Sequence, residues 1–354
     1  MNISKILIII RRSNGDVFLS SALINALHEH YQNPKIDLLV DEGTLAIAKT
    51  LKHINEILVF SHDKKNSLSQ DLSIIRRIYK KYDLCISLTA TDRNILYAVL
   101  ASKISISAVD PENKKSWWKK VLLSKFYKFD LRRHMIYNTL EPLKLLGINI
   151  KSYDYAPHID EDKCKKTLLK FGLQSDDYMI FHPSAQFIFR TYPIKNINTL
   201  LEKLVTLNIK IVITGGNDAI NHNISEALVQ HDKILNLITK TSLQELYHLI
   251  SQCKVHIGMD TLNTHIAASF DKHLIAIYGP NGVTQWSPFN AKLAYAPSVD
   301  TPPLTKYGNF TIIQADMPCV PCNQNGCKGL GKSECLENIT PEIIFDEVKN
   351  CLTK

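Results

Sequence analysis

Short runs of β-branched and other apolar residues alternate with longer amphipathic stretches along nearly the whole chain. In the first half these runs are KILIII (5–10), IDLLV (36–40), EILVF (56–60), LCISL (84–88) and ISISAV (104–109). The stretches between them, among them ALINALHEHY and LSIIRRIYKKY, carry apolar residues on one helical face and charges on the other. This alternation predicts parallel α/β layers.

The second half repeats the alternation, with apolar runs at 178–182, 210–214, 234–237, 254–258 and 273–279. The polar segment KSYDYAPHIDEDK between the halves is typical of a linker. We therefore predict two Rossmann-like domains, at 1–155 and 156–340, followed by a C-terminal helix at 341–354. Two open parallel sheets that face each other would leave a ligand cleft between their carboxyl edges.

Composition places the chain among ordinary globular proteins, with 354 residues of which 45% are hydrophobic and 21% charged. Its 42 basic residues exceed its 34 acidic ones, so acidic partners such as nucleotides, phosphorylated glycans or an anionic membrane surface are favoured. Zinc-finger, aromatic RNA-binding and basic-tail patterns are missing, so we expect no nucleic-acid partner. Because no apolar run is long enough to span a membrane and no secretory signal is evident, we expect a cytoplasmic protein.

The loop after the first predicted strand, RRSNGD (11–16), combines one glycine with an acidic residue. Gly15 permits a tight turn, but this loop is neither a dinucleotide fingerprint nor a Walker loop. A carboxylate at a helix N-terminus competes with a phosphate for the same N–H groups. Asp16 is therefore either a structural helix cap or a group that deprotonates a hydroxyl.

Three loops of the second half carry candidate anion-binding groups. HPSAQFIFRTYP (182–193) holds a serine donor and an arginine able to grip phosphate oxygens. TGGND (214–218) follows a strand, and its paired glycines let a flat ring or a ribose approach the backbone. In 254–280 a strand runs through Asp260 and Thr261 into a short helix, which aims a helix N-terminus at an anion such as a diphosphate. Ordinary βα turns and a solvated arginine are the structural alternatives.

In their order along the chain, these motifs are similar to those of one enzyme family. SNGD, HPSA with RTYP, ITGGND, KTSLQELYHLISQC, MDTLNTHIAA with YGPN, and HMIYNTLEPLKLLGI together resemble the ADP-heptose:lipopolysaccharide heptosyltransferases. The resemblance covers nearly the whole chain. It implies the GT-B fold, in which two Rossmann-like domains face each other across a cleft, and transfer of a sugar with inversion.

By this resemblance, Asp16 is the catalytic base that takes the proton of the acceptor hydroxyl while it attacks the anomeric carbon opposite ADP. Ser13, Gly15 and Arg93 are expected to contact the acceptor. The departing diphosphate needs a cation or a helix dipole beside it. The chemistry then requires neither a cofactor nor a covalent sugar–enzyme intermediate.

On the donor side, the resemblance implies that Arg190 neutralises charge on the departing ADP. The other expected donor-binding residues are Ser184, Gly215, Gly216, Asp218, Asp260, Thr261 and His265. The family usually has glycine after the Asp-Ser/Thr pair of the diphosphate loop, whereas this chain has Leu262. Because a side chain there disfavours positive φ and crowds the backbone, we expect a donor pocket that differs from the family's.

The segment ENKKSWWKKVLLSKFYKFDLRRHM (112–135) mixes basic and aromatic residues and suits an anionic amphiphile at a membrane. We expect Lys115, Lys119 and Lys120 to contact the acceptor. Alternatively, the segment is a solvated loop whose aromatic side chains pack on the domain.

Four of the eight cysteines cluster near the C-terminus, at Cys319, Cys322, Cys327 and Cys335. Their close spacing allows a tetrahedral thiolate site for a structural zinc or iron ion. Plain reduced thiols are the alternative. A metal here would hold a loop outside the cleft rather than take part in the chemistry.

We therefore expect an inverting transferase that moves heptose from ADP-L-glycero-D-manno-heptose to the inner core of a lipid A–Kdo type lipopolysaccharide acceptor. It would work in the cytoplasm, peripheral to the inner face of the inner membrane of a Gram-negative bacterium. One alternative is an enzyme that heptosylates a protein such as an autotransporter, or that uses another nucleotide sugar. Another is a non-catalytic nucleotide-sugar-binding module.

Overall fold

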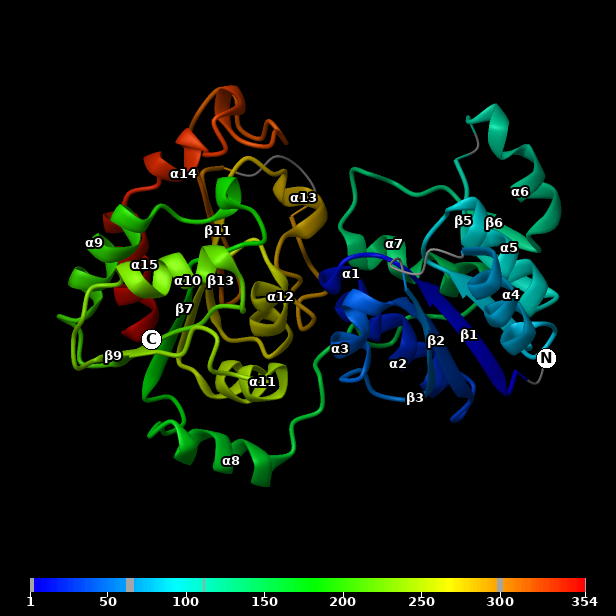
Figure 1. The fold of residues 1–354 in the computed structure, drawn as a ribbon, viewed down its shortest axis with the longest axis horizontal. Coiled ribbons are helices and arrows are strands. Elements are labelled where there is room, and N and C mark those ends of the chain that lie inside the picture. The colour runs from blue at the N-terminus through cyan, green and yellow to red at the C-terminus, as the bar shows by residue number, and fades with distance from the viewer. Residues whose placement is uncertain (1–2, 62–66, 111, 298–301, 354) are drawn as a thin grey trace. The chain divides into compact units, whose positions relative to one another are not determined.

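A computed structural model describes residues 3–61, 67–110, 112–297 and 302–353 of the chain. The chain divides into two compact units, Met1–His158 and Ile159–Lys354, each built around its own sheet. In Figure 1 the first unit is coloured from blue through cyan and the second from green to red.

The sheet of the first unit has six strands in the order β3-β2-β1-β4-β5-β6, with every neighbouring pair parallel. The strands are β1 (Lys5–Ile10), β2 (Lys35–Asp41), β3 (Ile54–Phe60), β4 (Leu84–Ser87), β5 (Ile104–Ala108) and β6 (Lys125–Tyr127). The central strands β1 and β4 are buried on both faces, which explains their continuous apolar sequences.

Seven helices flank this sheet (Figure 1). They are α1 (Asn14–Leu19), α2 (Ser21–His30), α3 (Leu45–Ala48), α4 (Ser67–Ile78), α5 (Asp92–Ala101), α6 (Trp117–Leu122) and α7 (Met135–Leu145), with short 3-10 helices at η1 (Glu42–Thr44) and η2 (Lys114–Ser116). Ile74 and Ile78 of α4 pack with Tyr97 and Ala98 of α5 in one buried cluster, so the apolar face predicted for this stretch is the face that meets the domain.

The sheet of the second unit has seven strands in the order β12-β13-β11-β10-β7-β8-β9. The strands are β7 (Tyr178–His182), β8 (Lys210–Ile213), β9 (Ile234–Asn236), β10 (Val255–Met259), β11 (His273–Tyr278), β12 (Leu304–Tyr307) and β13 (Phe310–Gln314). The edge pair β12 and β13 is antiparallel, and the other described pairs are parallel.

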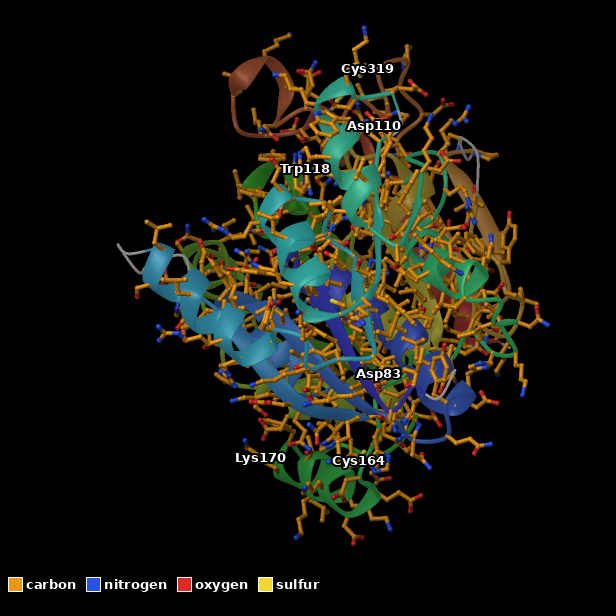
Figure 2. All side chains as sticks on the ribbon, turned by 90° about the vertical axis from the view of Figure 1, so that its right-hand side faces the viewer. Asp83, Asp110, Trp118, Cys164, Lys170 and Cys319 are labelled. Atoms are coloured by element: carbon orange, nitrogen blue, oxygen red, sulfur yellow. The ribbon has the colours of Figure 1, made fainter. Side chains whose placement is uncertain are left out.

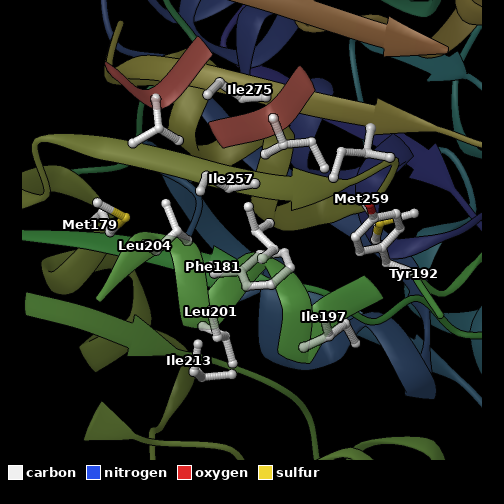
Figure 3. Packing of buried hydrophobic residues seen from close by; sticks show 14 of the residues in the cluster. Met179, Phe181, Tyr192, Ile197, Leu201, Leu204, Ile213, Ile257, Met259 and Ile275 are labelled. Atoms are coloured by element: carbon white, nitrogen blue, oxygen red, sulfur yellow. The ribbon is translucent and has the colours of Figure 1, made fainter. Parts of the chain in front are cut away.

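The described helices of the second unit are α8 (Glu161–Lys170), α9 (Ile194–Leu204), α10 (Ala219–Ala227), α11 (Leu243–Gln252), α12 (Leu262–Ser269), α13 (Val283–Trp286), α14 (Glu334–Asn338) and α15 (Pro341–Leu352), with 3-10 helices η3 (Ile188–Arg190) and η4 (Cys327–Gly329). Helices α9, α10, α14 and α15 contribute residues to one large core, part of which Figure 3 shows from close by. Ile197, Leu201 and Leu204 form the buried stripe of α9. Ile344 and Val348 of α15 join the same core, so the C-terminal helix is part of this unit.

Both sheets reverse their strand order at one central pair, β1 and β4 in the first unit and β7 and β10 in the second. The loops that follow the two strands of such a pair leave the carboxyl edge of the sheet in opposite directions. The crevice between these loops commonly holds the ligand. Residues far apart in sequence are thereby brought to one place. In the first unit the backbone N–H of Arg11, after β1, donates to the hydroxyl of Thr89, after β4, at 3.0 Å.

All ten predicted strands are confirmed to within two residues at each end. The sequence analysis missed β6, β12 and β13. All three lie at an edge of a sheet or next to one. The strands β6 and β12 are short, and most of their residues are exposed or half-buried, so these two strands lack the continuous apolar run of a central strand. Among the described residues no helix is long and apolar enough to cross a membrane.

Candidate active site

The loop after β1 places Asp16 at the carboxyl edge of the first sheet. Helix α1 begins after its N-cap residue Ser13, and Asp16 is the third residue of the helix. Asp16 is therefore not the N-cap itself, but its carboxylate bonds to Ser13, which is. Gly15 is the second residue of the helix.

The Asp16 carboxylate makes a hydrogen bond through one oxygen and an ion pair through the other, Oδ1, which has no hydrogen-bond partner among the described residues. Ser13 Oγ donates to Oδ2 at 2.7 Å, and Arg12 Nε forms an ion pair with Oδ1 at 3.1 Å. Asp16 is only 5% exposed, and this burial raises its pKa, while the Arg12 charge and the Ser13 hydrogen bonds lower it. Because burial is the largest effect, the pKa is raised on balance, as suits a carboxylate that has to accept a proton.

A small pocket in front of Asp16 has a largely apolar and aromatic wall. It is lined by Ile10, Arg12, Asp16, Leu88, Tyr127, Phe129, Met135, Asn138 and Thr139. The Arg12 guanidinium carbon lies 5.7 Å from the centre of the Phe129 ring, within the range of a cation–π contact. Arg12 thus lies between the carboxylate and an aromatic ring, and the apolar surroundings strengthen its attraction to Asp16.

None of the predicted acceptor residues lines this pocket, although Ser13 donates a hydrogen bond to Asp16, which does. Arg93 forms an ion pair with Asp71 at 3.3 Å and lies over the Phe60 ring. Lys119 Nζ is held 2.7 Å from the Asp92 carboxylate and donates to a backbone carbonyl. Lys115 is exposed. The basic residues of 112–135 therefore belong to a surface beside the pocket's aromatic wall rather than to the pocket.

In the second unit, the loop after β7 carries Ser184 and Arg190. The loop is closed by Thr191, whose hydroxyl accepts a hydrogen bond from the Ala185 N–H at 3.1 Å. Ser184 is almost fully buried. Arg190 ends η3 and lies over the stacked rings of Phe187 and Phe189, while its Nε is buried without a hydrogen-bond partner among the described residues.

The loop after β10 brings Asp260 to the same sheet edge as Arg190. Asn281 Nδ2 donates to Asp260 Oδ2 at 3.0 Å. Burial raises the pKa of Asp260, and the Asn281 hydrogen bond and the Arg190 charge lower it. The electrostatic influence of Arg190 on Asp260 means that the two loops meet at the β7–β10 reversal, as the strand order requires.

The N-terminus of α12 has polar groups without partners. Thr261 is the N-cap, yet its side chain makes no capping bond and its buried Oγ1 has no hydrogen-bond partner among the described residues. The same holds for Nδ1 of His265, which is buried in the first turns. Burial lowers the pKa of His265 to about 4, so near neutral pH it is a neutral hydrogen-bonding group. Leu262 is the first helical residue.

The glycine pair after β8 packs against the helix that follows it. A Cβ on Gly215 would lie 2.1 Å from Asn221 Oδ1, so glycine is needed here for close packing. Asp218 is the N-cap of α10 and accepts from the backbone N–H and the side-chain amide of Asn221, at 3.0 and 2.6 Å. These contacts give Gly215 and Asp218 structural roles, and a donor-binding role for them and for Gly216 stays a prediction.

Three of the four C-terminal cysteines, Cys322, Cys327 and Cys335, are close enough to influence one another electrostatically. Burial is the main cause that raises the pKa of Cys335 to about 11, and the Cys327 and Cys322 thiols contribute to it. Cys319 is exposed. Within the described ranges, no group of three or more histidine, cysteine, aspartate or glutamate side chains is arranged to hold a metal ion. A structural zinc or iron ion at these cysteines stays a prediction, with plain thiols as its alternative.

A larger pocket, of about 260 Å³, lies at the opposite, amino edge of the first sheet. It is lined by the end of α2, the turn before β3 and residues 148–154. None of the residues predicted from the sequence lines it. The predicted catalytic and donor-binding residues therefore lie at the carboxyl edges of the sheets, although the pocket at the amino edge is larger.

Arg12, Asn281 and Phe129 are among the residues of these sites that were not predicted. Arg12 precedes Asp16 by four residues, the spacing at which opposite charges meet on a helical turn. Asn281 lies in the quoted YGPN motif, but nothing in the sequence pairs it with Asp260. Phe129 follows the edge strand β6, which was not predicted, and this strand brings Phe129 to the Asp16 pocket.

Solved structures share the fold over nearly the whole chain. The glycosyl transferase family 9 protein of Veillonella parvula matches with a TM-score of 0.77 at 18% identity, covering 100% of this chain and 99% of that one. Escherichia coli ADP-heptose lps heptosyltransferase II matches with a TM-score of 0.72 at 19% identity, covering 99% and 98%. The two units and these matches define the GT-B fold.

Sequence comparison identifies the family. Residues 72–322 match the model of glycosyltransferase family 9 (heptosyltransferase), and the chain belongs to this family. Lipopolysaccharide heptosyltransferase 3 of Escherichia coli K12 is 25% identical over 295 residues, which cover 80% of this chain and 84% of that protein. The resemblance inferred from the ordered motifs is thereby confirmed.

Proposed function

We propose that the protein transfers heptose from ADP-L-glycero-D-manno-heptose to the inner core of lipopolysaccharide, with inversion at the anomeric carbon. Family membership and the lipopolysaccharide heptosyltransferases among its relatives support the sugar and the acceptor class. The observation that carries the mechanism is the buried Asp16 carboxylate, held by Arg12 and Ser13 in front of an apolar pocket.

In the proposed reaction, the acceptor hydroxyl oxygen forms a bond to the anomeric carbon while the bond from that carbon to the ADP oxygen breaks. The electron pair leaves with ADP, and the hydroxyl proton passes to Asp16. A positioned general base typically contributes about 10²- to 10⁴-fold to the rate. No step requires a metal or an organic cofactor.

The second unit would bind the donor. Arg190, the Thr261 hydroxyl, His265 and the N–H groups at the start of α12 offer donors for the diphosphate oxygens. Arg190 would also stabilise the charge that develops on the leaving ADP. Leu262 begins the helix where the family usually has glycine, so we propose that it limits how closely the diphosphate approaches.

The acceptor is an amphiphile, so we further propose that the enzyme works at the inner face of the inner membrane. The exposed basic segment 112–135 of the first unit supports this location.

A donor and acceptor screen with purified protein tests the function. We expect turnover of ADP-heptose with a defined core acceptor, and an inverted anomeric configuration by NMR spectroscopy. Transfer to a protein acceptor, or turnover of a different nucleotide sugar, would replace this proposal by the corresponding transferase. Nucleotide-sugar binding without turnover of any donor would indicate a binding module.

A further inference from the structure

The residues from 117 to 131, here named the α6 surface, are both apolar and basic. Five large hydrophobic side chains of this stretch are exposed: Trp117, Val121, Leu122, Phe126 and Leu131. Trp117 is 67% exposed, and Val121 and Leu131 are 71% exposed each. Scattered exposed apolar residues are normal, but a dense group of this kind marks an interaction site.

The structure separates the outward-facing side chains of the α6 surface from those that anchor it. Trp118, labelled in Figure 2, packs against a small buried cluster of Ile95, Val109 and Leu123. Its neighbour Trp117 does not, and it shares a face of α6 with Val121, four residues later. The alternative in which all aromatic side chains of this segment pack on the domain is therefore wrong for Trp117 and Phe126.

The charge of this region is strongly one-sided. Residues 112–135 hold six lysines and two arginines against two acidic residues, a net charge of +6 out of +8 for the whole chain. Lys114 and Lys115 are exposed and form no ion pair within the described part of the chain. Ammonium groups beside exposed apolar side chains match a surface with anionic headgroups above an apolar layer.

We propose that the α6 surface docks the protein on an anionic lipid bilayer. Trp117, Val121 and Leu131 enter the boundary between headgroups and acyl chains, and Lys114 and Lys115 contact the lipid phosphates. The proposal rests on the proposed function in one respect. A lipopolysaccharide acceptor is embedded in a membrane, so an enzyme that modifies it has to reach that membrane. A lipid surface explains the observations better than a folded protein partner, because the basic residues flank the apolar ones as they do in helices that lie at an interface.

Vesicle binding and fluorescence quenching test the docking. The full-length protein should sediment with phosphatidylglycerol-containing vesicles and not with phosphatidylcholine vesicles, and binding should weaken as salt is raised. Brominated lipids should quench the tryptophan fluorescence of the wild type. The quenching should persist in Trp118→Phe and be lost in Trp117→Phe, because only Trp117 would reach the lipid.

Two sets of variants separate the apolar and ionic contributions. The double variant Lys114→Gln/Lys115→Gln should bind anionic vesicles more weakly, by roughly fivefold per lysine. Val121→Ser with Leu131→Ser should weaken it at every salt concentration. Leu169→Ser is the matched control, since Leu169 is 78% exposed on α8 of the second unit and should have no effect.

Failure of the docking can be told apart from failure of the proposed function. Absence of binding to anionic vesicles, or equal quenching in the two tryptophan variants, overturns the docking even if the enzyme still transfers heptose to a detergent-dispersed acceptor. Vesicle binding with the expected variant effects, but no heptose transfer, would support the docking and count against the proposed reaction.

Discussion

The Asp16 site of the first unit and the Arg190 site of the second unit differ in how far their polar groups already have partners. Asp16 Oδ2 accepts a hydrogen bond from Ser13, and Oδ1 forms an ion pair with Arg12, although Oδ1 has no hydrogen-bond partner among the described residues. At the other site, Arg190 Nε, Thr261 Oγ1 and His265 Nδ1 are buried without hydrogen-bond partners among the described residues. Buried polar groups without partners are costly, and a ligand that supplies acceptors removes that cost.

The contrast suggests a division of labour. A carboxylate that is fixed before substrate arrives keeps its orientation and its pKa, as a general base requires. Donor groups left without partners favour an anion that comes and goes with each turnover. We infer that the first unit sets the proton transfer and that the second unit sets the binding and departure of ADP.

The largest expected effect comes from Asp16→Asn, which keeps the shape of the side chain and removes its basicity. We expect the single-turnover rate to fall by about 10³-fold, within the range for loss of a general base. Asp83→Asn is the control, because Asp83 is a carboxylate of the same unit that bonds to Ser4 at the amino edge of the sheet. A rate within tenfold of the wild type for Asp16→Asn would remove the base assignment.

The next largest effect is expected for Arg190→Met, which keeps much of the apolar stem and removes the cation. Loss of charge stabilisation on the leaving group should lower kcat by roughly 10²-fold. Arg190→Lys should recover part of this loss, since it restores the charge but not the planar fork. Arg77→Met removes an exposed arginine of a surface ion pair and should leave kcat unchanged.

Removing the Arg12 partner should move the pH profile rather than abolish activity. The Arg12 charge lowers the pKa of Asp16, so Arg12→Gln should raise that pKa. Because Asp16 is active only when ionised, the acid limb of the kcat profile should shift to higher pH. Ser13→Ala should shift it in the same direction by less. A uniform loss at all pH values would show that Arg12 acts only on structure.

The smallest effect is expected for Thr261→Val, which removes one hydroxyl from the donor site. The affinity for ADP should fall by about two- to tenfold, the usual range for one hydrogen bond. Thr206→Val is the control, because the Thr206 hydroxyl bonds to Lys203 O on the exposed side of the second unit. Unchanged ADP affinity in Thr261→Val would mean that its hydroxyl has no ligand contact.

The sequence predicts the architecture because the central strands are buried on both faces. KILIII and YMIFH are unbroken apolar runs, and each corresponds to a strand beside the reversal of its sheet. The edge strand KFY has no such run, because two of its three residues are exposed. The central strands of a sheet can therefore be identified from the sequence, whereas the edge strands lack the apolar run that would identify them.

The sites are predictable only in part, since the motifs give the residues but not their partners. Asp16 was found from its loop, whereas the Phe129 ring on the wall of its pocket depends on how β6 and the following residues fold back. Asp218 is a second example. The resemblance implies that Asp218 binds the donor, and the structure adds that its carboxylate caps α10, a contact that the sequence analysis did not assign to it.

The most direct test of this division is the affinity for ADP, measured by isothermal titration calorimetry for the wild type, Asp16→Asn and Arg190→Met. If the second unit binds ADP and the first does not, Asp16→Asn should bind within twofold of the wild type, while Arg190→Met should bind roughly tenfold more weakly, as for loss of one charge-assisted contact. Equal weakening in both variants, or wild-type affinity in Arg190→Met, would contradict it.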